Sequence, residues 1–384
     1  GCSRTSVVTV TSAPSAITGD DVVCVGGNII LASTTTGGTW SSGSVVRATV
    51  NAVTGSVAGV SAGLVVVSYS LGTTCYVTKQ LTVNSTPSSI TGTGAVCVGN
   101  TLTLGHAVPS GTWSTSSPNI TIGASTGVVT GITAGTAVVT YNTSAGCFVT
   151  ATVTVNALPA AIGGTATVCE GATTTLTGSG AGTWSSGTTD VATIGSSSGI
   201  VSGLQAGTSS VVFTLNSTGC SISRIVTVNA LPSVISGSLS VCAGSSVTLT
   251  NTATGGSWTS ASTTIATIDE STGSVSGIAV GTSLVSYTTA AGCRRTAVVT
   301  VNALPASISG TSSLCVGSTA TLTSATASQT WSTSNSSVAT VATGTTTTGI
   351  VTGAGVGTAT ISYTNANGCS RTSVVTVTSA PSAI

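Results

Sequence analysis

Short stretches in which apolar and polar residues alternate recur along the whole chain, separated by turns rich in Gly, Ser and Thr. Residues 101–104 are typical, because their alternation has the period of a half-buried strand. No stretch places apolar residues at helical spacing, so almost no helix is expected. Between Pro87 and Asn156 the pattern predicts seven short strands, at residues 87–96, 101–104, 111–114, 120–122, 128–132, 137–141 and 147–155.

The pattern repeats with a period of about 73 residues, longer than the roughly 20–50 residues of most solenoid units. Each unit is long enough for a small domain with its own core. Proline marks the period at Pro14, Pro87, Pro159, Pro232, Pro305 and Pro381. Tryptophan follows it at Trp40, Trp113, Trp184, Trp258 and Trp331, and a second aromatic at Tyr69, Tyr141, Phe213, Tyr287 and Tyr363.

Closely spaced strands with a turn between each pair are typical of a sandwich with immunoglobulin (Ig)-like topology. We therefore expect an all-β fold, a tandem array of five Ig-like antiparallel β-sandwich domains with about seven strands each. The expected repeats 1 to 5 cover residues 14–86, 87–158, 159–231, 232–304 and 305–380. Residues 1–13 are interpreted as the last strand of a preceding repeat, and residues 381–384 as the start of the next one.

The two ends of the chain have the same sequence. Residues 1–17 are identical to residues 368–384, whereas the repeats between them resemble one another without being identical. Identity at the ends with divergence inside indicates a window from a longer periodic chain. We expect the chain to be one super-repeat of a polymer plus a short overlap.

The amino-acid sequence of the repeats resembles that of the bacterial Ig-like group 2 domain. Val-Ala-Thr-Ile at 191–194 is followed by Ser-Gly-Ile-Val-Ser-Gly-Leu at 198–204 and Ala-Gly-Thr at 206–208, and residues 338–361 match equally well. The added Val-Cys-x-Gly and Gly-Cys elements resemble repeats of very long secreted surface proteins of Bacteroidota-type bacteria. The resemblance implies an Ig-like fold and a cell-surface setting, and it says little about activity.

The ten periodic aromatic residues are candidates for the core of each repeat. One Trp and one Tyr or Phe recur at the same spacing in every unit, which favours packing inside the sandwich. A role in stacking against a ligand is the alternative.

The eleven cysteines occupy two registers. One precedes the second strand (Cys24, Cys97, Cys169, Cys242 and Cys315), and the other begins the last strand (Cys2, Cys75, Cys147, Cys220, Cys293 and Cys369). Regular pairs predict disulfides and an oxidising, extracellular setting. A zinc site is disfavoured, because no repeat adds a nearby His or a Cys-x-x-Cys partner.

Two disulfide patterns fit the sequence. Pairing inside a repeat would join Cys24–Cys75, Cys97–Cys147, Cys169–Cys220, Cys242–Cys293 and Cys315–Cys369. In Ig-like topology, however, the turn before the second strand and the turn before the last strand carry the two cysteines of a repeat. These turns lie at opposite ends of the sandwich, roughly 23 Å apart. Pairing between neighbours would instead join Cys24–Cys147, Cys97–Cys220, Cys169–Cys293 and Cys242–Cys369, with Cys75 and Cys315 bonded to adjoining super-repeats.

Charge excludes several function classes. The chain has 7 Lys and Arg, 6 Asp and Glu and one His, so it has no basic patch for nucleic acid and few groups for acid–base catalysis. His106, Lys79, Arg224 and Arg294–Arg295 are expected on the surface. The acidic pairs Asp20–Asp21 and Asp269–Glu270 are too sparse for a calcium site. We expect no enzyme, cofactor or metal, and no apolar run reaches the length of a membrane span.

These observations favour a structural protein, namely a subunit of a long extracellular bacterial fibre at the cell surface. Its partner would be itself, through head-to-tail continuation of the chain and through lateral bundling, which low charge permits. The alternative is the spacer of a cell-surface adhesin that carries a binding module elsewhere. A third hypothesis is direct binding of sugar or ice by Thr-rich faces.

Overall fold

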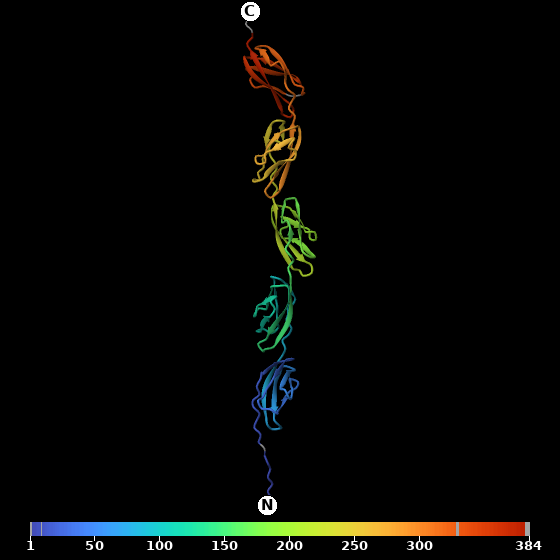
Figure 1. Cartoon of the computed structure of the whole chain (residues 1–384), viewed down its shortest axis with the longest axis vertical. Coiled ribbons are helices and arrows are strands. Elements are labelled where there is room, and N and C mark those ends of the chain that lie inside the picture. Colours follow the sequence, from blue (N-terminus) through green and yellow to red (C-terminus); the bar gives the residue numbers. More distant parts are fainter. Residues whose placement is uncertain (1, 9, 328–329, 381–384) are drawn as a thin grey trace. The chain divides into compact units, whose positions relative to one another are not determined.

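The computed structural model describes residues 2–8, 10–327 and 330–380. The described residues form 37 strands and no helix, which confirms the all-β prediction. Figure 1 shows the strands of each repeat gathered into a β-sandwich of their own. By residue contacts the chain divides into two compact units. The first holds residues up to Gly163 with Thr177–Trp184 and Val212–Ser223, and the second holds the rest.

One layer of each repeat is a four-stranded sheet that contains the long strand pair near the end of the unit. Its strands in repeats 1 and 2 are β1 (Val22–Cys24), β7 (Tyr76–Asn84), β6 (Gly63–Ser70) and β3 (Thr39–Ser42), then β8 (Ala95–Cys97), β14 (Phe148–Asn156), β13 (Gly135–Asn142) and β10 (Thr112–Thr115). In repeats 3 and 4 they are β16 (Thr167–Cys169), β22 (Ser221–Asn229), β21 (Gly207–Leu215) and β18 (Gly182–Ser186), then β23 (Ser240–Cys242), β29 (Arg294–Asn302), β28 (Gly281–Thr288) and β25 (Ser257–Ser260). In repeat 5 they are β31 (Ser313–Cys315), β37 (Ser370–Thr378), β36 (Gly357–Thr364) and β33 (Thr330–Thr333).

The other layer has three or four short strands. These are β2 (Asn28–Ile30), β5 (Ser56–Gly59) and β4 (Ala48–Val50) in repeat 1, and β9 (Thr101–Thr103), β12 (Val128–Gly131) and β11 (Ile120–Ile122) in repeat 2. Repeat 3 has β15 (Gly163–Gly164), β17 (Thr173–Thr177), β20 (Ile200–Gly203) and β19 (Ala192–Ile194). Repeat 4 has β24 (Ser246–Thr248), β27 (Ser274–Gly277) and β26 (Ala266–Ile268), and repeat 5 has β30 (Ser309–Gly310), β32 (Thr319–Thr323), β35 (Thr348–Gly353) and β34 (Ala339–Thr345).

The first strand differs from the sequence prediction in repeat 2. A strand was expected over residues 87–96, but β8 covers only Ala95–Cys97, and Thr91 makes an isolated bridge to Gly105 in the opposite layer. The chain therefore crosses between the two layers at residues 92–94, where Gly92 has a φ of 75°. A further difference is that β8 pairs with β14 in parallel, whereas the other pairings in repeat 2 are antiparallel.

The core of each repeat follows from strict alternation in the long strands. In β6, Val65, Val67 and Tyr69 are buried, while Leu64 and Val66, which alternate with them, are exposed. In four of the repeats the tryptophan lies directly opposite the periodic tyrosine across the antiparallel pair. Trp184 and Phe213 also contact each other, with ring centroids 4.7 Å apart. All ten aromatic residues are at most 7% exposed, which places their rings between the layers.

The segment at the start of the chain is not a strand here. The described residues 2–8 and 10–13 belong to no strand and are all exposed, whereas the same sequence at residues 369–380 contains β37, which pairs with β36 and β31. The difference arises because a strand needs partners in a sheet. Residues 2–8 and 10–13 have no such partner in the part of the chain that the structure describes. Residues 381–384, the expected start of the next repeat, lie outside the described residues.

Candidate functional site: the joints between repeats

Four disulfides join each repeat to the next one. They connect Cys24 to Cys147, Cys97 to Cys220, Cys169 to Cys293 and Cys242 to Cys369, with Cα atoms 5.6–5.8 Å apart. The first two lie within the first compact unit and the last two within the second. This is the second of the two patterns that the sequence left open.

Strand register explains why cysteines of one repeat do not pair with each other. Cys24 ends β1 opposite Asn84, the last residue of β7. Cys75 precedes Tyr76, the first residue of the same strand, so about nine residues of extended backbone, or about 30 Å, separate it from the level of Cys24. A disulfide needs its Cα atoms within about 7 Å.

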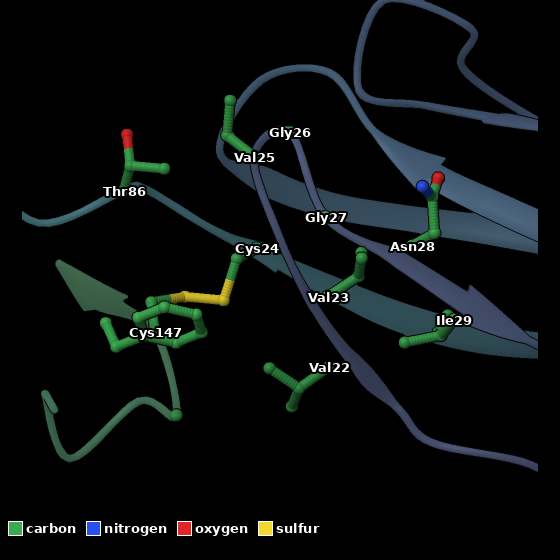
Figure 2. Close-up of a pocket in the computed structure, with 12 residues that line it drawn as sticks. Val22, Val23, Cys24, Val25, Gly26, Gly27, Asn28, Ile29, Thr86 and Cys147 are labelled. Carbon is green, nitrogen blue, oxygen red and sulfur yellow. A yellow bond between two sulfur atoms is a disulfide. The ribbon is translucent and has the colours of Figure 1, made fainter. Parts of the chain in front are cut away.

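The joint between repeats 1 and 2 shows how the cysteines are held. Asn84 Nδ2 donates a 3.0 Å hydrogen bond to the Ala145 carbonyl in the hairpin that carries Cys147. In Figure 2 the disulfide lies at a pocket of about 390 Å³, lined by residues 22–29, Thr86 and residues 146–148. None of these residues has a free ionisable side chain, so the hollow offers packing and backbone hydrogen bonds rather than catalytic groups.

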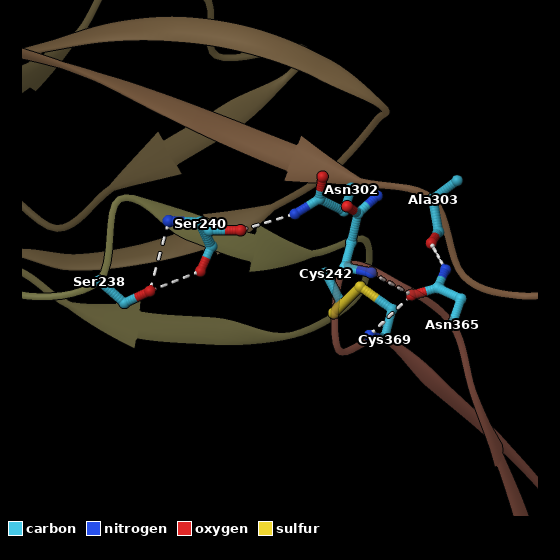
Figure 3. Close-up of a disulfide and its surroundings, with 8 residues drawn as sticks. Ser238, Ser240, Cys242, Asn302, Ala303, Asn365 and Cys369 are labelled. Atoms are coloured by element: carbon cyan, nitrogen blue, oxygen red, sulfur yellow. Dashed lines mark hydrogen bonds between the residues drawn. A yellow bond between two sulfur atoms is a disulfide. The ribbon is translucent and has the colours of Figure 1, made fainter. Parts of the chain in front are cut away.

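The joint between repeats 4 and 5 has related contacts from other positions (Figure 3). Asn365 Nδ2 donates to the Ala303 carbonyl at 2.9 Å, and its Oδ1 accepts the Cys369 N–H at 3.0 Å. Asn302 Nδ2 donates to Ser240 Oγ at 2.6 Å. Cys369 is fully buried, and the exposed fractions of Cys147, Cys220 and Cys293 are at most 1%.

The asparagines at the joints were missed in the sequence. Asn84, Asn302 and Asn365 each donate a side-chain hydrogen bond beside a bridging cysteine. A signal was present for Asn84 and Asn302 but not for Asn365, because Val-Asn ends the last strand of repeats 1 to 4, just before the linker. It marks the residue at which each sheet ends.

Three cysteines are not in a disulfide: Cys2, Cys75 and Cys315. Cys75 nevertheless has a position like that of the hairpin cysteines in other repeats. Its Sγ lies 3.0 Å from Thr11 Oγ1 and contacts the Thr11 carbonyl. Cys293 Sγ contacts the carbonyl of Asn229 in the same way. Cys315 Sγ lies 3.8 Å from Thr378 Oγ1, at the end of β37.

Of the basic side chains expected on solvent faces, Arg294 and Arg295 are exposed, whereas Lys79 and Arg224 are half-buried and bond the backbone of their own repeats. Lys79 Nζ donates to the Gly19 carbonyl at 2.7 Å and lies 3.2 Å from Asp21. Arg224 Nη1 donates to the equivalent carbonyl of Gly164 at 2.9 Å. These contacts hold the chain where it crosses between layers.

His106 is half-buried, which corrects its assignment to the surface. Its ring stacks on Tyr141 with centroids 4.2 Å apart, and Nε2 lies 2.9 Å from the Ser88 carbonyl. A ring that packs flat on a core aromatic loses contact with solvent on one face.

The acidic residues show no arrangement for a cation. In residues 2–8, 10–327 and 330–380, no group of three or more His, Cys, Asp or Glu side chains gathers. Asp269 instead caps a turn, where hydrogen bonds from the Thr272 hydroxyl and N–H and from Ser271 lower the pKa of its carboxyl to about 2. Among the same residues, no helix has the length and apolar character to cross a bilayer.

Comparisons with known proteins add only distant likenesses. No family model and no curated protein matches the chain. Among solved structures, the human desmocollin-1 ectodomain has 12% identity and a TM-score of 0.18, over 97% of this chain and 100% of that one. Eight Ig domains of Down syndrome cell adhesion molecule have 11% identity and a TM-score of 0.23, covering 97% and 61%. Domains 1–6 of surface layer protein SbsC have 15% identity and a TM-score of 0.19, covering 95% and 67%.

Proposed function

We propose that the chain is a structural subunit of a long extracellular bacterial fibre, built from tandem Ig-like domains that disulfides link to their neighbours. The observation that carries the proposal is that each of the four disulfides joins two different repeats. A bond inside a domain stabilises that domain alone, whereas a bond between domains restrains the joint. Restrained joints suit a protein whose task is mechanical.

The disulfides also support an extracellular setting, since such bonds persist in oxidising compartments. The resemblance to bacterial Ig-like group 2 domains, and to repeats of Bacteroidota-type surface proteins, supports a bacterial cell surface. We retain the five repeat boundaries 14–86, 87–158, 159–231, 232–304 and 305–380 as part of the proposal.

The unpaired cysteines support the proposed head-to-tail continuation of the chain. The register pairs the first cysteine of one repeat with the hairpin cysteine of the next, so Cys315 would bond a hairpin in the following super-repeat. By the same register Cys75 and Cys2 would bond preceding repeats. The 17-residue identity between the two ends supports such periodic continuation.

Lateral bundling is supported by the outer sheet face. In repeat 4, Leu284 and Val298 are direct cross-strand partners and are 43% and 53% exposed. A formal net charge of +1 leaves little repulsion between neighbouring chains.

Electron cryomicroscopy of the native material tests the proposal. Strands of this length predict a length of about 35–40 Å for each sandwich, so five repeats would give an axial period of about 200 Å. Continuous filaments with that period support the fibre. Short stalks that end in a different density would contradict it and would favour the alternative, the spacer of an adhesin.

A further inference from the structure

The disulfides connect the repeats in two interleaved series, because each bond closes a separation of 123–127 residues while the repeats advance by about 73. Between one disulfide and the next in a series, the backbone is short. Two covalent routes result. The first route passes through Cys24, Cys147, Cys169 and Cys293, and the second route through Cys97, Cys220, Cys242 and Cys369.

Each backbone piece of a route begins with the last strand of one repeat, continues through the linker, and ends with the strand of the next repeat that carries its first cysteine. In the first route the piece from Cys147 to Cys169 contains β14 and β16. In the second route the piece from Cys220 to Cys242 contains β22 and β23.

The two routes lie side by side inside each sandwich. In repeat 2, β8 of the second route pairs in parallel with β14 of the first, and Val98 N–H donates to the Asn156 carbonyl at 3.0 Å. In repeat 3 the roles are exchanged, since β16 of the first route pairs in parallel with β22 of the second. Parallel strands that end at the same level are pulled in the same direction, so both carry tension.

The stretches that hold the aromatic core lie outside both routes. Residues 98–146 contain Trp113 and Tyr141, and residues 170–219 contain Trp184 and Phe213. Tension along either route therefore bypasses these stretches covalently.

We propose that the two routes keep the chain whole after any single backbone break between Cys24 and Cys369. Every position in this interval is spanned by at least one disulfide. The linker between repeats 2 and 3 is the critical case, because the Cys97–Cys220 bond alone spans it. The biological value of this continuity rests on the proposed fibre function, while the continuity itself rests on the disulfides alone.

Disulfides inside repeats would not have this property. A bond from Cys97 to Cys147 would span residues of repeat 2 only, and every linker would remain a single covalent connection. A cut in a linker therefore separates the two arrangements.

The experiment inserts a recognition site for a sequence-specific protease between Ala157 and Leu158, which are both exposed. The full chain is used, with Cys2, Cys75 and Cys315 replaced by Ser so that free thiols cannot exchange with the disulfides. After cleavage, non-reducing electrophoresis is expected to show one species at full mass, and reducing electrophoresis two fragments. Two fragments without reductant would overturn the proposal.

A matched pair of variants identifies the bond responsible. Cys97→Ser with Cys220→Ser should release two fragments without reductant, whereas Cys169→Ser with Cys293→Ser should not. Peptide mapping checks that Cys24–Cys147 and Cys242–Cys369 form in both variants. If the first variant stays joined, a different connectivity is present and the proposal fails. Microscopy of the native filaments reports on the fibre function separately, since a chain without a fibre role would still pass the cleavage test.

Discussion

Cys97 lies directly opposite Asn156 in the parallel pair of β8 and β14. The second route leaves repeat 2 at Cys97 through its disulfide, and the first route leaves at Asn156 through the backbone. The same relationship joins Cys24 to Asn84, Cys169 to Asn229 and Cys242 to Asn302. One parallel pairing of three residues thus sets the position from which each repeat reaches the next.

Two interleaved routes predict that the loss of either central disulfide, Cys97–Cys220 or Cys169–Cys293, leaves the maximum length of the chain unchanged. When the chain is pulled by its termini, the shortest covalent path with all four bonds contains roughly 115 residues, or about 400 Å fully extended. With Cys97→Ser and Cys220→Ser, an alternative path of about the same length remains. Single-molecule force spectroscopy measures this limit.

Two further extension limits serve as references for this measurement, namely that of the fully reduced chain and that expected if the cysteines paired inside repeats. Full reduction should raise the limit to about 1,300 Å, since all 384 residues then extend. Pairing inside repeats would contradict the structure by making the double substitution add about 350 Å.

Gly127 is predicted to tolerate no side chain. Its φ is +67°, and a Cβ there would lie 2.7 Å from the Leu104 carbonyl oxygen and 3.0 Å from the Trp113 ring. Gly127→Ala should cost about 1–2 kcal/mol for the backbone conformation and about 1–3 kcal/mol for the contact. Hydrogen exchange of repeat 2 amides measures the loss, with tenfold faster exchange for each 1.4 kcal/mol.

Gly146→Ala is the control for Gly127→Ala. Gly146 has a φ of +81° but no atom within 4 Å of the added Cβ, so it should show the backbone cost alone. Equal effects of the two substitutions would mean that the Trp113 ring does not restrict this turn.

The hydroxyl of Tyr141 is predicted to fix the loop that precedes Trp113. It accepts the Gly111 N–H at 2.9 Å and donates to the Val108 carbonyl. Tyr141→Phe should destabilise repeat 2 by about 1–3 kcal/mol, because it leaves a half-buried N–H and a carbonyl without partners. Hydrogen exchange of residues 98–146 tests this, with repeat 3 as the internal reference.

Tyr76→Phe provides the comparison, since Tyr76 is 59% exposed and should change stability by less than about 0.5 kcal/mol. A loss at Tyr76 as large as that at Tyr141 would show that the effect does not come from the loop contacts.

Asp269 is predicted to make repeat 4 sensitive to acid. Its folded-state pKa of about 2 lies below the ordinary value of 3.8, because the Thr272 hydroxyl and neighbouring donors stabilise the carboxylate. A lowered pKa adds stability that is present above about pH 4 and is lost as the pH falls through about 2. An NMR titration of the carboxyl measures the pKa directly.

Asp269→Asn tests the cause. Asn51 occupies the equivalent turn of repeat 1 and accepts the Val53 and Thr54 N–H groups with its neutral amide oxygen. The variant should therefore keep the turn and lose the extra dependence on pH between about 4 and 2. An unchanged acid response of repeat 4 would assign it to another group.

The fold could be predicted because its determinants are local and are repeated. The alternation in stretches such as residues 137–141 defines both a strand and its buried face. A Trp and a Tyr or Phe at the positions of Trp113 and Tyr141 recur in every unit and identify the core, because bulky residues at the same place in each repeat pack between the layers. The first strand was misplaced, because the crossing at Gly92 depends on which layer offers a partner.

The joints could be predicted only as alternatives. An all-β array of repeats, two cysteine registers and the scarcity of charge could be read from the sequence alone, because they depend on composition and on short-range pattern. Which cysteines bond was decided by the tertiary structure. The parallel pairing of β1 with β7 places Cys24 at the end of the sandwich opposite to Cys75, and a disulfide forms only between atoms that the fold brings within reach.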